Sequence, residues 1–122
     1  MTDRPQRERV LVVEDEAMVA LGLEMVLTDA GCDVVGPIGK VDEALATVRD
    51  AEVDFALLDV NLHGDEVFPV ADALVERGIP FAFLTGYGRD SLPPHHAGGR
   101  ILFKPFDVSR LVALVKEEAK AR

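Results

Sequence analysis

Five short apolar runs, separated by segments with helical spacing, constrain the fold of this chain more than any other feature of its sequence. The runs lie at residues 10–13, 33–38, 55–58, 81–84 and 101–103. Apolar side chains elsewhere recur every three or four positions, which predicts helices at about residues 17–30, 41–48, 67–77 and 108–115. Strands that alternate with helices form parallel sheets, and continuous apolar runs indicate strands buried on both faces. The sequence therefore predicts a doubly wound α/β domain, in which helices cover both faces of a five-stranded parallel sheet.

Two connections of the predicted fold carry turn signals. Residues 61–66 are polar and predict a loop before the third helix, which tolerates Pro69 in its first turn. Residues 86–100 contain four glycines and two adjacent prolines, so any helix there is expected to be short or irregular. This second connection is expected to be the least regular part of the chain.

Length and charge limit the functions that the chain can have. Its 122 residues fit one domain, expected at residues 9–122 behind a flexible polar tail at residues 1–8. The 22 acidic and 13 basic residues give a formal charge of −9, which repels phosphate backbones and anionic lipids. We therefore expect no nucleic-acid or membrane partner and, without a long apolar segment, a cytoplasmic location. Cys32 is the only cysteine, which excludes an internal disulfide, and it is expected to fill a small buried space.

Polar side chains follow four of the five predicted strands. Glu14 and Asp15 come after the first strand, Asp59 after the third, Thr85 after the fourth and Lys104 after the fifth. The carboxyl ends of parallel strands meet at one edge of the sheet, where ligands bind, so these side chains are expected to converge. Three carboxylates held together need a cation or a proton, and Mg²⁺ prefers oxygen ligands of this kind. A hydroxyl and an ammonium suit an oxyanion, so the set predicts phosphoryl transfer to an aspartate.

Four sequence blocks at these strand ends resemble the acidic, phosphoacceptor, hydroxyl and lysine blocks of response-regulator receiver domains. The blocks lie at residues 10–16, 55–59, 83–86 and 102–106. The resemblance extends over about residues 9–120, and the four blocks in this order are specific as a set. It implies the flavodoxin-like strand order 2-1-3-4-5 and a cis bond between Lys104 and Pro105.

The same resemblance implies a role for each candidate site residue. Asp59 would accept a phosphoryl group from a histidine kinase or phosphotransfer protein, and Thr85 and Lys104 would contact that group. Mg²⁺ would be held by Glu14, Asp15, Asp59 and the backbone carbonyl of Asn61. With no output domain visible in the sequence, we expect a stand-alone receiver that signals through protein contacts, as a monomer or weak dimer. Such a domain assists its own phosphotransfer and autodephosphorylation but is a phosphoacceptor rather than an enzyme.

Residues 83–87 read Phe-Leu-Thr-Gly-Tyr, similar to a subset of receivers with a Phe-x-Thr-Gly-Tyr block that is associated with HWE-type histidine kinases. Ile101 stands where many receivers place an aromatic residue that turns inward on phosphorylation. We therefore expect Tyr87 and residues 86–100 to change their order when Asp59 is phosphorylated. A Tyr87 that merely covers the edge of the sheet is the open alternative.

Other functions fit these residues less well. A phosphatase of the haloacid-dehalogenase type needs a second aspartate two positions after the first, where this chain has Ala17 and Asn61. A flavodoxin-like cofactor binder would need a loop rich in Ser, Thr and Gly after the first strand, where residues 14–16 are acidic. A degenerate receiver that binds partners without phosphorylation remains the main alternative.

Two further groups of residues have open interpretations. Met18, Leu21 and Met25 form a second apolar stripe on the first helix, which either packs against the last helix or docks a kinase's helical phosphotransfer domain. The three histidines, at 63, 95 and 96, have no spacing that recommends a metal site and are expected in loops. A ligand role for the adjacent pair is left open.

Overall fold

The computed structural model describes residues 7–62, 64–86 and 92–120. The expectations for residues 1–6 of the tail, for His63 and for Tyr87 lie outside these residues. Within the described part of the chain, no helix has the length and apolar character needed to cross a membrane.

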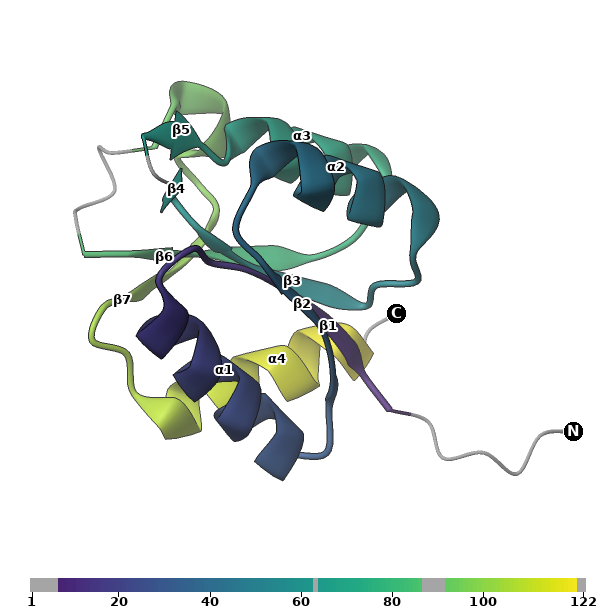
Figure 1. Cartoon of the computed structure of the whole chain (residues 1–122), viewed down its shortest axis with the longest axis vertical. Helices are drawn as coiled ribbons and strands as arrows, with labels where there is room; N and C mark the ends of the chain where they lie inside the picture. Colours follow the sequence, from purple (N-terminus) through teal and green to yellow (C-terminus); the bar gives the residue numbers. More distant parts are fainter. Residues whose placement is uncertain (1–6, 63, 87–91, 121–122) are drawn as a thin grey trace, which may run out of the picture.

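Five parallel strands form the central sheet, as the apolar runs predict (Figure 1). They are β1 (Arg9–Val13), β2 (Asp33–Ile38), β3 (Phe55–Asp59), β6 (Phe81–Thr85) and β7 (Arg100–Phe103). Their spatial order is β2-β1-β3-β6-β7, which confirms the order 2-1-3-4-5 implied by the resemblance. The order reverses between β1 and β3, because the chain first moves outward to β2 and then returns past β1. The carboxyl ends of β1 and β3 therefore flank the point where doubly wound sheets bind their ligands.

Helices cover both faces of this sheet. α1 (Ala17–Asp29) and α4 (Val108–Lys120) lie on one face, and α2 (Val41–Asp50) and α3 (Phe68–Glu76) on the other (Figure 1). Successive strand residues point to opposite faces, so Val12 packs in the core beneath α1 and α4, and Leu11 in the core beneath α2 and α3. Both faces are buried, which is why each strand reads as a continuous apolar run. Cys32 is buried in the core beneath α1 and α4, as expected.

The loop predicted at residues 61–66 contains regular structure, and the prediction is wrong in this respect. β4 (Asn61–Leu62) pairs antiparallel with β5 (Asp65–Glu66). Gly64 has a φ of 88°, and its N–H donates a hydrogen bond to the Asn61 Oδ1 at 2.9 Å. Leu62 is buried, whereas its neighbours in the two strands are exposed. Strands of two residues show no alternating pattern in a sequence, so this hairpin gives no signal there.

The connection between β6 and β7 is irregular, as its glycines and prolines predict. Among its described residues, 86 and 92–99, only the 3₁₀-helix η2 (Pro94–His96) has regular structure. The Lys104–Pro105 bond after β7 is cis, as the resemblance implies. Pro69 lies in the first turn of α3, as expected.

One edge strand, β2, is interrupted near its carboxyl end. Leu11 pairs with Val35 and Val13 pairs with Ile38, so β2 has one residue more than β1 over this stretch. Gly36, one of the two residues of β2 within this irregularity, has a φ of 101°, and a Cβ atom there would lie 2.9 Å from the Ile38 backbone nitrogen. Only a glycine fits without strain in this conformation.

Candidate functional site

Three carboxylates meet at the reversal point of the sheet. Glu14 and Asp15 follow β1, and Asp59 is the last residue of β3, which pairs with β1. Carboxylate oxygens of the three residues lie within 4.8 Å of one another. Glu14 is 3% exposed and Asp59 9% exposed, so water screens their mutual repulsion only weakly. The structure therefore brings together the three acidic residues that the sequence placed at one edge.

Lys104 reaches into this carboxylate group from the end of β7. Its Nζ lies 3.0 Å from the Glu14 Oε1 and 3.2 Å from the Asp59 Oδ1, and it donates a hydrogen bond to each. The Lys104 backbone N–H donates to the Thr85 carbonyl at 2.8 Å, which fixes the end of β7 beside β6. The lysine bridges acidic residues that come from two different strands.

Burial and charge shift the pKa values of this group. Burial raises the pKa of Glu14, and the charge of Asp59 raises it further, although the hydrogen bond from Lys104 opposes both. Burial lowers the pKa of Lys104, but the hydrogen bond to Glu14 and the charge of Asp59 outweigh it, so the pKa is raised. Lys104 is therefore a fixed cation at neutral pH. One ammonium cannot neutralise three carboxylates, which leaves a demand for a further cation.

Thr85 and Asn61 complete the set of residues singled out in the sequence. Thr85 is the last residue of β6, the strand next to β3, and is 2% exposed. Asn61 lies two residues beyond Asp59 and is exposed, and its side-chain oxygen accepts the hydrogen bond from Gly64. This turns the Asn61 side chain to the β4–β5 hairpin, which leaves its backbone carbonyl as the group that could bind a metal. Thr85 and Asn61 thus lie on segments next to Asp59, one at the end of the neighbouring strand and the other two residues along the chain.

Residues 10–116 of the chain match the model of one protein family, which is described as "Response regulator receiver domain". The chain belongs to this family. Receiver domains are signalling domains of two-component systems, bind Mg²⁺ in the active site and are generally not classed as enzymes. The carboxylate group at the ends of β1 and β3 is an acidic cluster of the kind that such a magnesium site requires.

Curated relatives of this receiver are longer proteins. Transcriptional regulatory protein PdtaR from Mycobacterium tuberculosis is 29% identical over 112 residues, which cover 88% of this chain and 55% of PdtaR. DNA-binding response regulator MtrA from the same species is 34% identical over 114 residues, which cover 90% of this chain and 50% of MtrA. The chain therefore spans about half the length of these relatives.

Solved receiver structures match nearly end to end. The solution structure of SdrG from Sphingomonas melonis Fr1 has a TM-score of 0.80 and 38% identity, covering 93% of this chain and 97% of SdrG. The receiver domain of sensor histidine kinase PA1611 from Pseudomonas aeruginosa has a TM-score of 0.81 and 20% identity, covering 94% and 99%. That domain is described with a magnesium ion coordinated in its active site cleft.

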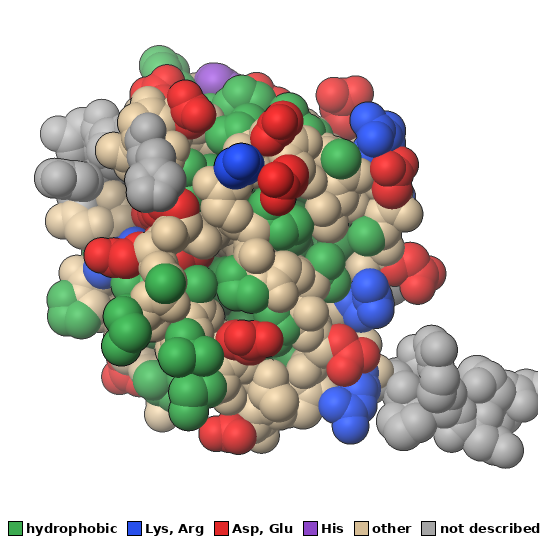
Figure 2. All heavy atoms as spheres, viewed as in Figure 1, with side chains coloured by type: hydrophobic (Ala, Val, Ile, Leu, Met, Phe, Trp, Pro, Cys, Tyr) green, Lys and Arg blue, Asp and Glu red, His purple; other side chains and the backbone are tan. Residues whose placement is uncertain are grey.

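The second apolar stripe of α1 is exposed, so its packing against the last helix is ruled out. Met18 is 78% exposed, Leu21 50% and Met25 59%. Figure 2 shows hydrophobic side chains gathered over α1 on this face of the receiver. The other interpretation of the stripe, as a docking patch, remains a proposal.

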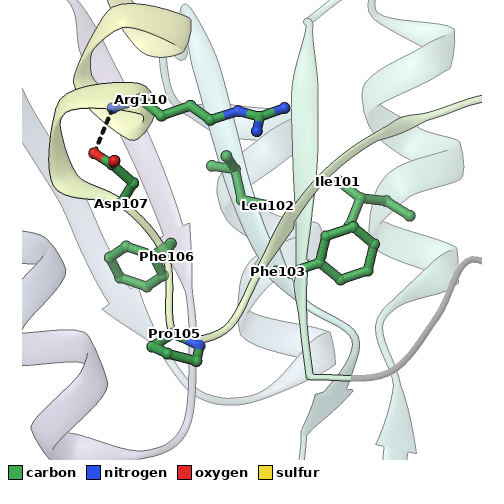
Figure 3. Close-up of a pocket in the computed structure, with 7 residues that line it drawn as sticks. All are labelled: Ile101, Leu102, Phe103, Pro105, Phe106, Asp107 and Arg110. Carbon is green, nitrogen blue, oxygen red and sulfur yellow. Dashed lines mark hydrogen bonds between the residues drawn. The ribbon is translucent and has the colours of Figure 1, made fainter.

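A hollow of about 210 Å³ lies beside β7 and the start of α4 (Figure 3). It is lined by Ile101, Leu102, Phe103, Pro105, Phe106, Asp107 and Arg110. Asp107 accepts a hydrogen bond from the Arg110 backbone N–H at 3.2 Å, which holds the first turn of α4 in place. Lys104 itself does not line the hollow, so this space is separate from the carboxylate group.

Sequence reasoning missed one group of polar side chains. Asp72 of α3 lies against His95 and His96, both of which were expected to be loop residues. Both histidines lie in the one-turn 3₁₀-helix η2 within the irregular connection, and His96 is 6% exposed, a burial that the sequence did not predict. The two histidines of η2 contact a residue of α3 that lies more than twenty positions earlier in the chain. A pair of adjacent histidines in the sequence does not predict such a contact.

Proposed function

We propose that this receiver is a stand-alone phosphoacceptor switch, in which Asp59 accepts a phosphoryl group from a histidine kinase or phosphotransfer protein. The observation that carries the proposal is the placement of Lys104 between Asp59 and Glu14, within a group of three carboxylates. An ammonium in contact with the nucleophile can neutralise charge on an arriving phosphoryl group.

The residues around Asp59 fit a magnesium ion. Glu14, Asp15 and Asp59 offer carboxylate oxygens within 4.8 Å of one another, and the Asn61 carbonyl lies two residues further on. Mg²⁺ binds through one or two carboxylates with water and phosphate oxygens, so this donor set suits it. When bound, the ion supplies charge neutralisation for the transferring group. The magnesium described for the PA1611 receiver supports the same assignment here.

The chain's own residues then divide the work of phosphotransfer. A carboxylate oxygen of Asp59 attacks the phosphorus, and the new P–O bond forms as the P–N bond to the donor imidazole breaks. The Lys104 ammonium neutralises negative charge on the phosphoryl oxygens, and the Thr85 hydroxyl donates a hydrogen bond to one of these oxygens. The resulting acyl phosphate is lost to water in autodephosphorylation, which resets the switch.

Signalling through protein contacts is the second part of the proposal. The match to this chain covers 97% of SdrG, which supports a receiver that acts alone. A structure of SdrG in a BeF₃-activated conformation also matches this chain, with 42% sequence identity. The Phe-Leu-Thr-Gly-Tyr block at residues 83–87 favours a donor of the HWE type. The exposed stripe on α1 would dock the donor's helices. We further propose a cytoplasmic monomer or weak dimer.

The first experiment is to incubate the protein with magnesium and acetyl phosphate and to measure its intact mass. We expect a gain of one phosphoryl group that requires magnesium and is absent from Asp59→Asn. Asp65→Asn removes an exposed carboxylate of the β4–β5 hairpin and is the matched control that keeps the gain. No gain in a folded wild-type protein would reject the switch and favour binding that does not depend on phosphorylation.

The proposed switch segment needs a separate measurement. We expect amide hydrogen exchange within residues 86–100 to change when beryllofluoride and magnesium are added. Asp59→Asn under the same conditions is the control, because it removes the atom to which the phosphate analogue attaches. Identical exchange in this segment with and without the analogue would reject a change of order around Tyr87.

A further inference from the structure

The imidazole rings of His95 and His96 both contact one carboxylate oxygen of Asp72. None of these three residues belongs to the carboxylate group around Asp59. The Nε2 of His95 lies 3.1 Å from the Asp72 Oδ1, and the Nε2 of His96 lies 2.8 Å from the same atom. One ligand-type atom from each residue lies within 4.8 Å of the other two. The three side chains come from α3 and η2, which are adjacent in space but separated by β6 in the sequence.

The ring of His96 is held in place by aromatic packing. Its centroid lies 5.5 Å from that of Phe83 and 6.1 Å from those of Phe68 and Phe81. Its side chain is 5% exposed. A ligand fixed by its surroundings loses little rotamer freedom when it binds an ion, which favours a defined site over transient contacts.

The other two ligand groups face solvent. The side chain of His95 is 61% exposed and that of Asp72 is 53% exposed. An ion can therefore reach the cluster from one side, and water can take a further coordination position. One buried and two exposed ligands give an open site rather than a closed structural one.

The donor types and spacings suit zinc. A tetrahedral Zn²⁺ ion with ligands at about 2.0–2.2 Å has neighbouring ligand atoms roughly 3.3 Å apart. The two nitrogen–oxygen distances, 3.1 Å and 2.8 Å, are close to this value, and all three ligand atoms lie within 4.8 Å of one another. Imidazole nitrogens favour Zn²⁺ and related transition ions, whereas Mg²⁺ favours oxygen donors alone. The two clusters of possible ligands among the described residues therefore differ in the metals that their donor atoms favour.

We propose that Asp72, His95 and His96 form a second metal site, which binds one Zn²⁺ ion with water as the fourth ligand. The bound ion ties η2 to α3 and so restrains the connection that follows Thr85. None of its residues belongs to the carboxylate group around Asp59, so zinc binding does not require phosphotransfer, although His95 and His96 lie within the proposed switch segment at residues 86–100.

The test is a zinc titration of the tag-free, full-length protein against a chromophoric chelator, in millimolar magnesium. Magnesium occupies oxygen-only sites, so we expect one equivalent of zinc to bind with micromolar or tighter affinity. His95→Gln and Asp72→Asn change exposed side chains, and each is expected to weaken zinc binding at least about tenfold. His63→Gln is the matched control, since it removes the third histidine of the chain and is expected to leave the affinity unchanged.

Nitrogen-15 NMR of the imidazole rings gives the second readout. Zinc is expected to shift the Nε2 resonances of His95 and His96, and to leave the ring of His63 unaffected. Unchanged affinity in both His95→Gln and Asp72→Asn would overturn the proposal, as would the absence of stoichiometric binding. Loss of zinc only in Asp59→Asn would place the ion at the phosphorylation site and would equally overturn it.

Discussion

Asp59 is the residue at which charge, metal and phosphoryl chemistry meet. Its Oδ1 contacts Lys104, while oxygens of Glu14 and Asp15 lie close by. An ion that neutralises this group binds the folded protein and not the unfolded chain, so magnesium is linked to stability.

Magnesium is therefore expected to raise the free energy of unfolding of the wild-type receiver. At a magnesium concentration ten times the dissociation constant, the gain is about 1.4 kcal/mol. Asp59→Asn removes a carboxylate ligand and is expected to lose most of this gain, whereas Asp65→Asn keeps it. Thermal unfolding with magnesium or with EDTA measures the difference, and an equal gain in Asp59→Asn would contradict the proposed metal ligands.

Residues at strand ends could be found from the sequence, whereas the histidine cluster could not. Parallel strands bring their carboxyl ends to one edge, so the position of Asp59 or Lys104 along the chain predicts its place in space. No such rule predicts the position of His96, because it lies in an irregular connection and contacts Asp72, which is 24 residues away in the sequence. Contacts of this kind depend on how loops pack, which periodicity does not encode.

At the scale of single elements, two glycines are predicted to respond in opposite ways to alanine. Gly22 lies within α1, and a Cβ atom added there would have no other atom within 4 Å, so Gly22→Ala is expected to stabilise by about 0.5–1 kcal/mol. Gly36→Ala is expected to destabilise by about 1–3 kcal/mol, because the Cβ would clash with backbone at a positive φ. Urea unfolding checks both. A Gly36→Ala variant at least as stable as the wild type would show that the break in β2 does not require glycine, and a destabilised Gly22→Ala variant would contradict the prediction for α1.

The proposed docking role of the exposed stripe on α1 can be tested by introducing a charged side chain into it. Leu21→Arg is expected to slow phosphotransfer from a donor histidine kinase at least about tenfold, because it places a cation in an apolar contact. Val75→Arg is the matched control, since Val75 is 61% exposed on α3, on the opposite face of the sheet. Both changes are expected to alter the free energy of unfolding by less than about 0.5 kcal/mol.

Labelling by acetyl phosphate separates docking from chemistry in the same variants. A small donor does not need the stripe, so Leu21→Arg is expected to accept its phosphoryl group at the wild-type rate. Unchanged transfer from the kinase to Leu21→Arg would count against a docking role for α1.

Long elements were predictable from the sequence, and short ones were not. The apolar runs and helical spacings gave all five strands of the main sheet and the four α-helices, with ends shifted by a few residues. The β4–β5 hairpin was missed, because two-residue strands leave no periodicity to read. The exposure of Met18 and Met25 was also left open, since the sequence does not say whether a second apolar stripe packs against a neighbouring helix or faces solvent.

At the scale of the whole molecule, the excess of acidic residues opposes folding. The formal charge is −9, and Figure 2 shows acidic side chains spread across the face that it displays. Salt screens repulsion between exposed charges beyond about 8–10 Å. Added sodium chloride, in EDTA to exclude divalent ions, is therefore expected to raise the melting temperature. A melting temperature that falls with salt would indicate that the surface ion pairs outweigh the net repulsion.

The break in β2 has a consequence for how two copies of the protein can meet. β2 is an outer strand of the sheet, and an outer strand with regular unpaired N–H and C=O groups is a template for a strand of another molecule. Pro37 offers no N–H, and the extra residue of β2 in this stretch disturbs the regular spacing of the remaining groups. The carboxyl end of this outer strand is thereby a poor template for strand-to-strand aggregation, which favours contacts between copies through side chains on this side.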